Sequence, residues 1–143
     1  MPQSRREQIV REILARIAAA VSPVAVLRQP TAAIPREQSP ALVLRIESDA
    51  PIKRINELME REFVLRLIGH ARDPVDGYAV ADDLVCRAHA ALLSEASLGG
   101  LALGVTEMEA DYQAEDADVE AIAIPATYRI TYRTLVSDIT QGG

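Results

Sequence analysis

The spacing of the apolar residues changes along this chain, and that change constrains the fold most. Residues 4–22 and 77–96 carry apolar side chains every three or four positions, as an α-helix with one buried face does. Residues 41–47, 61–71 and 122–133 instead alternate apolar and polar side chains, as a half-buried strand does. Both periods in separate segments favour an α+β fold, with two helices packed on one face of a mostly antiparallel sheet.

The residues that flank the first helix predict where it begins and ends. Ser4 and Glu7 have the spacing of a capping box, in which each side chain accepts the other residue's backbone N–H, and Pro23 ends the helix. A pair between Glu7 and Arg11 supports the exposed side. The predicted buried face comprises Ile9, Val10, Ile13, Leu14, Ile17, Ala20 and Val21.

Between the helices the sequence predicts three strands. Residues 24–28 form a short β-prone run, and residues 29–40, with three prolines, are expected to be a mobile loop. Residues 48–51 are expected to end the second strand. Residues 52–60 fit either a helical turn or an extended hairpin arm, and we favour the arm.

The region after the second helix completes the predicted sheet. Residues 101–112 are expected to form a strand, followed by an acidic turn at residues 114–118 and by the last strand. Pro125 implies a sheet edge or a bulge there, because proline has no N–H to donate. Residues 137–143 are expected to be a loose tail. The predicted order is α-β-β-β-α-β-β in a single domain, residues 1–143, whose length suits one core.

Composition excludes several classes of function. One Cys and two His are too few for a four-ligand zinc site, so no metal is predicted. A net charge of −6 disfavours binding to DNA or to an anionic membrane, so no specific nucleic acid and no membrane is expected as partner. The charge is unevenly spread: residues 1–72 hold 12 of the 15 basic side chains against 8 acids, and the remainder holds 3 against 13.

No established catalytic or cofactor-binding motif occurs in the sequence. Cys86 and His89 lie three residues apart on the second helix, a spacing that allows a thiolate–imidazole pair, but no third group to orient them lies nearby in the sequence. We therefore predict no catalytic residue, no cofactor and no enzymatic activity.

Three groups of residues are candidates for contact with another molecule. Glu107, Glu109 and Asp111 alternate along one predicted strand and form either a solvated acidic face or a docking surface for a basic partner. Cys86, Ala90 and Leu93 form a minor apolar stripe that is either a subunit contact or covered within the chain. Arg129 and Arg133 lie on the polar face of the last strand. The candidate subunit or tube interface therefore comprises Cys86, Leu93, Glu107, Glu109, Asp111, Arg129 and Arg133.

Several of these segments resemble one known family. The run Ser-Glu-Ala-Ser-Leu-Gly-Gly-Leu-Ala-Leu at residues 94–103, the acidic strand at 107–112, and Thr-Tyr-Arg-Ile-Thr-Tyr-Arg-Thr at 127–134 followed by Asp138 resemble the C-terminal half of tail terminator proteins of long-tailed bacteriophages. This family is also called minor tail protein U or tail completion protein.

The resemblance implies a structural protein of the virion tail, assembled in the host bacterial cytoplasm. It implies a homohexameric ring that caps the tail tube, stops its polymerisation and prepares head joining, with the tail tube protein and a head-completion protein as partners. It also implies no catalysis and no cofactor. Two alternatives remain open: a neighbouring head–tail connector role in the neck, and a small ligand-binding or enzymatic α+β domain with the acidic hairpin as its site.

A ring needs two different patches that meet head to tail. The oppositely charged halves of the sequence either supply such patches or attract each other within one subunit.

Overall fold

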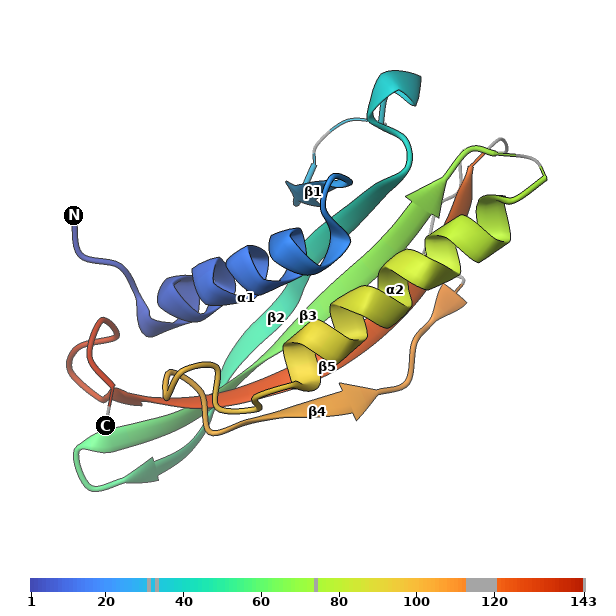
Figure 1. Ribbon diagram of the computed structural model, residues 1–143. Coiled ribbons are helices and arrows are strands. Elements are labelled where there is room, and N and C mark those ends of the chain that lie inside the picture. Colours follow the sequence, from blue (N-terminus) through green and yellow to red (C-terminus); the bar gives the residue numbers. More distant parts are fainter. Residues whose placement is uncertain (31, 33, 74, 113–120, 143) are drawn as a thin grey trace.

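The structure, a computed structural model, describes residues 1–30, 32, 34–73, 75–112 and 121–142. Its elements are α1 (Arg5–Val21), β1 (Ala25–Arg28), a short 3₁₀ helix η1 (Arg36–Gln38), β2 (Ala41–Ile55), β3 (Leu58–Ala71), α2 (Gly77–Leu93), β4 (Gly104–Met108) and β5 (Ile122–Leu135). The strands form one sheet in the order β1-β2-β3-β5-β4, and both helices lie on the same face of it (Figure 1). The predicted α+β class and element order are confirmed.

The core fills the space between the helices and the sheet. β1 runs parallel to β2, and the other pairs are antiparallel. Because side chains alternate across a strand, every second residue of the long strands faces the helices. The largest fully buried side chains of this layer are Ile9, Ile13, Ile17, Leu42, Leu44, Phe63, Leu65, Leu67, Leu92, Leu98, Tyr128 and Tyr132.

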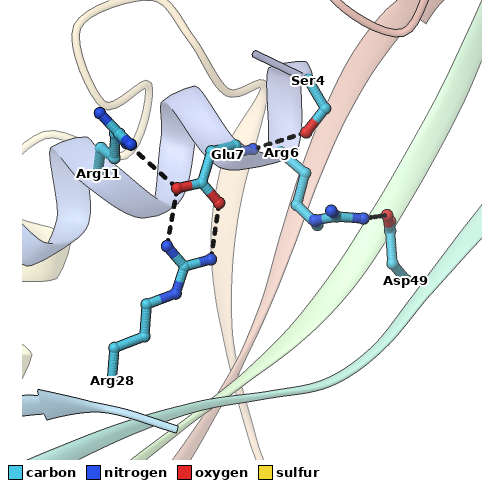
Figure 2. A network of polar contacts seen from close by, with 6 residues as sticks. All are labelled: Ser4, Arg6, Glu7, Arg11, Arg28 and Asp49. Atoms are coloured by element: carbon cyan, nitrogen blue, oxygen red, sulfur yellow. Dashed lines mark hydrogen bonds and ion pairs between the residues drawn. The ribbon is translucent and has the colours of Figure 1, made fainter. Parts of the chain in front are cut away.

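The first turn of α1 is held by polar contacts (Figure 2). Ser4 caps the helix by accepting the N–H of Glu7 at 3.1 Å, as predicted. The Glu7 carboxylate, however, binds both guanidinium nitrogens of Arg28 at 2.7 Å and Arg11 at 3.2 Å, rather than serving the second half of a capping box. Arg28 ends β1, so this contact joins the helix to the edge of the sheet.

A second polar contact fixes α1 over the middle of the sheet. Arg6 donates to the Asp49 carboxylate at 3.0 Å (Figure 2), and the Tyr132 hydroxyl donates to the same carboxylate at 2.8 Å. Burial, followed by the bond to Asp49, raises the pKa of Tyr132. Three elements far apart in the sequence therefore meet at one carboxylate.

The prediction that residues 48–51 end a strand is wrong. β2 continues through Pro51 to Ile55, with register shifts between Ile46 and Ser48 and between Pro51 and Lys53. β1 pairs only with Ala41–Leu44. Beyond that point the outer edge of β2 pairs with no strand among the described residues, and proline is tolerated at such an edge. The favoured hairpin arm is confirmed, with Asn56 in the left-handed region (φ 55°) of its turn.

The strand predicted at residues 101–112 is shorter than expected. Residues 94–103 form turns in which Leu98 is fully buried, and Gly99 and Gly100 adopt φ values of 73° and 86°. Only Gly104–Met108 pairs with β5. Pro125 lies where β5 extends past β4, which agrees with its predicted edge position. The acidic turn expected at 114–118 lies outside the described residues.

Two predicted loose segments contact the folded body. Ile34 of the 29–40 loop is buried against Ala41, Val43 and Ile68 on the sheet face opposite the helices. In the C-terminal tail, the Ile139 carbonyl accepts the backbone N–H of the first residue of α1 at 2.7 Å, and the backbone at residues 140 and 141 makes further hydrogen bonds. The expectation of a loose tail is therefore wrong for the described residues 137–142, because the tail satisfies backbone donors that the helix end leaves open.

Candidate interaction surface

The β4 edge forms one side of the sheet and carries two exposed carboxylates. Glu107 lies within β4 opposite Tyr128, and Glu109 follows the strand. Both are exposed, and neither forms an ion pair with another described residue. β4 is the last strand of the sheet, and among the described residues it pairs only with β5. The two exposed carboxylates therefore lie at the free edge of the sheet.

The prediction that Glu107, Glu109 and Asp111 lie along one strand is wrong. Only Glu107 belongs to a strand, because β4 ends at Met108. The backbone carbonyl of Asp111 accepts a hydrogen bond from Arg66, which is 5% exposed on the sheet face opposite the helices. The chain thus turns across the edge after β4, which separates Asp111 from Glu107.

His89 has a partner that the sequence did not reveal. Its Nδ1 lies 2.7 Å from the hydroxyl of Tyr128, which is 39 residues away on β5. Burial, with the nearby charges of Glu107 and Cys86, raises the pKa of Tyr128 to about 12, so this hydroxyl stays protonated at neutral pH. The sequence feature that could have predicted this contact is Tyr128 itself, which lies on a largely apolar strand face. A buried tyrosine hydroxyl needs a polar partner.

The Cys86 thiol lies 3.9 Å from the Asp82 carboxylate one helical turn away. Cys86, Ala90 and Leu93 are all exposed, so neither α1 nor the described part of the 29–40 loop covers this stripe. The stripe lies on the side of α2 next to β5, because Cys86 and Leu93 are three and four positions from His89, whose imidazole contacts Tyr128. Glu107 of β4 lies opposite the same tyrosine. Four of the seven candidate residues thus gather on one side of the molecule: Cys86, Leu93, Glu107 and Glu109.

Arg129 and Arg133 lie elsewhere, on the sheet face opposite the helices. Arg129 is 3.7 Å from Glu62, and Arg133 is 3.9 Å from Glu60, with each arginine side chain about two-fifths exposed. Each therefore has a loose carboxylate partner on β3 within the same chain.

The β2–β3 hairpin arm, residues 51–57, projects past the helices at the lower left of Figure 1. All seven residues are exposed, including Ile52 at 51% and Ile55 at 41%. Lys53 and Arg54 carry positive charge and form no ion pair with a described residue, whereas Glu57 is the one carboxylate of the arm. Sequence reasoning predicted the extended arm but not that both of its faces would be uncovered.

A cleft of about 850 Å³ lies at the other end of β3. Arg36, Arg72, Tyr78 and Ile122 contribute to its wall, and Arg72 also donates to the carbonyl of Ile34 at 2.9 Å. This cleft is separate from the predicted interface residues.

Neither metal-binding nor membrane-spanning features occur in the part of the chain that the structure describes. No group of three or more His, Cys, Asp or Glu side chains there is arranged to hold a metal ion. The helices in those same ranges are too short or too polar to cross a bilayer.

Comparisons with known proteins leave the surface without an assigned role. A scan against models of protein families gives no match, and a search of curated proteins also finds no match.

Proposed function

We propose that this protein is a structural assembly protein of the tail terminator type, which forms a ring on the end of a tail tube and stops its growth. In this role each subunit contacts two neighbours through different surfaces, the tube below, and a head-completion protein above. It performs no catalysis.

The hairpin arm carries this proposal. Its residues are exposed on both faces, yet Ile52 and Ile55 are large and apolar. The arm is also held in a defined position, because it pairs with β3, which in turn pairs with β5 as far as Leu58 opposite Leu135. The Val136 N–H also donates to the Glu57 carbonyl at 2.8 Å. A rigid projection with exposed apolar side chains of this kind suits burial against a second molecule.

The resemblance to tail terminators adds a second line of support. Its segments, residues 94–103, 107–112 and 127–134, belong to the turns after α2, to β4 and its end, and to β5. These elements are consecutive in space, since β4 pairs with β5. The similarity therefore falls on one side of the molecule, the side with exposed Cys86, Leu93, Glu107 and Glu109.

Sedimentation velocity and electron microscopy test the proposal together. We expect the purified protein to form hexamers at high concentration or on the ends of tubes polymerised from the tail tube protein encoded in the same genome. Capped tubes should be shorter than uncapped ones. Normal tube ends and a strict monomer at millimolar concentration would refute the proposal.

Two controls separate assembly from chemistry. Cys86→Ala and His89→Ala remove the single thiol and one of the two imidazoles of the chain, and both variants should still cap tubes. Loss of capping in a folded variant of either kind would favour the enzymatic alternative. In a phage lacking its terminator, tails of normal length that fail to join heads would instead favour the connector role.

A further inference from the structure

We propose that ring subunits are joined by the hairpin arm of one copy lying against the β4 edge of the next, with Lys53 facing Glu107. This inference rests on the ring proposed above and names the two surfaces that meet. The occupant of the β4 edge is therefore a second copy of this chain.

The β4 edge favours this partner over a second β4 edge. An exposed strand edge can pair with another strand, and charged side chains limit such pairing. Two β4 edges brought together would place Glu107 and Glu109 of both copies side by side, which is repulsive. A basic arm meets the same carboxylates with attraction. The charges thus disfavour a closed symmetric dimer and favour the head-to-tail contact that a ring requires.

The arm matches the edge in charge and in polarity. Lys53 lies opposite Glu60 in the hairpin, and Glu60 lies 3.9 Å from Arg133 on β5. Lys53 itself forms no ion pair with a described residue. Apolar side chains accompany both sets of charges. Ile52 and Ile55 on the arm are 51% and 41% exposed. Leu103, which precedes β4, and Met108, its last residue, are 50% and 36% exposed.

The two surfaces cannot meet within one subunit. β3 and β5 lie between β2 and β4. By register, Lys53 is level with Arg133 and Glu107 is level with Tyr128. Three strand spacings of about 4.8 Å and five residues of about 3.3 Å place the two residues about 20 Å apart. The pairing of the arm with β3 also prevents it from folding back.

A charge swap tests the contact. Lys53→Glu and Glu107→Lys should each weaken assembly about tenfold, because each replaces an attraction with a repulsion. The double variant Lys53→Glu/Glu107→Lys should restore assembly, since the swapped charges face each other between copies. The measurement is the concentration dependence of sedimentation, with thermal unfolding recorded to show that each variant is folded.

The matched control carries the same net charge in a different place. Lys53→Glu/Glu37→Lys uses an exposed carboxylate on η1, far from the arm, and should assemble as poorly as Lys53→Glu alone. Rescue by this control would show a net-charge effect and overturn the contact.

A crosslink adds a readout that is independent of charge. In a Cys86→Ala background, Ile55→Cys/Met108→Cys should give a ladder of covalent oligomers under oxidation, whereas either single cysteine should give dimers at most. If the protein assembles, but neither charge reversal weakens assembly and no ladder of crosslinked oligomers forms, the proposed contact is refuted and the ring proposal is not. If the wild-type protein neither assembles nor caps tubes, the ring itself is refuted.

Discussion

Replacing Glu7 with Gln tests whether the contacts of the first turn of α1 stabilise the fold. The Glu7 carboxylate accepts two hydrogen bonds from Arg28 and one from Arg11 (Figure 2). Bidentate pairs of this type are stronger than single-bond ion pairs. Glu7→Gln keeps the size of the side chain and removes its charge, so we expect the free energy of unfolding at pH 7 to fall.

The magnitude follows from the pKa of Glu7 and from its exposure. The Arg28 guanidinium, ahead of all other influences, lowers this pKa from 4.5 to about 2. At 1.36 kcal/mol per pH unit, that difference corresponds to about 3.4 kcal/mol as an upper bound. The side chains of Glu7 and Arg28 are 22% and 36% exposed, so water screens the pair. We therefore expect a loss of about 1–2 kcal/mol.

The loss depends on pH in a defined direction. Because Glu7 binds a proton less readily in the folded than in the unfolded state, its contribution is present above pH 4.5 and disappears as the pH falls towards 2. The difference in stability between the wild type and Glu7→Gln should therefore be constant near neutral pH and shrink below about pH 4.5.

Urea denaturation of four proteins measures this effect: wild type, Glu7→Gln, Arg28→Gln and the double variant. The cycle isolates the pair from the interaction of Glu7 with the helix dipole, and we expect a coupling energy of about 1 kcal/mol. Glu37→Gln, an exposed carboxylate, is the control and should change little. A coupling energy near zero at pH 7, or a stability difference that grows on acidification, would refute the reasoning.

Two further predictions concern packing and motion. Gly69→Ala should destabilise the protein by about 1–3 kcal/mol in thermal unfolding, because the added methyl group would collide with the Ala81 carbonyl of α2. Gly104→Ala, where no atom lies within 4 Å of the added methyl, should change little, and equal losses would contradict this explanation. Backbone relaxation should give the described residues of the 29–40 loop (29, 30, 32 and 34–40) lower order parameters than α1, since Ile34 is the one buried residue among them. Equal values would contradict the prediction.

Local sequence signals determined where the helices are and what they bury. The α1 boundaries at Arg5 and Val21 follow from the Ser4 cap and Pro23, and five of its seven predicted core residues are fully buried. These signals act between residues a few positions apart, so the sequence contains them directly. The element order and the α+β class follow from the same periodicity.

The extent of the strands was decided by tertiary pairing. Residues 48–51 contain Asp and Pro, which locally disfavour a strand, yet all four pair with β3, and register shifts on either side of them absorb the misfit. β4 is short for the opposite reason, since only five of its predicted residues find a partner on β5. Propensity is a weaker influence than an available partner strand.

The candidate interaction surface was also determined partly by the sequence and partly by the tertiary structure. The sequence identified Glu107, Glu109, Cys86 and Leu93 as residues to examine, but only the fold places them on one side of the molecule. The opposite charges of the two halves of the sequence are partly paired within the subunit, because β5 inserts between β3 and β4 and brings Arg129 and Arg133 to Glu62 and Glu60. Which charges neutralise each other and which remain exposed depends on strand order, a property of long-range pairing that no local pattern encodes.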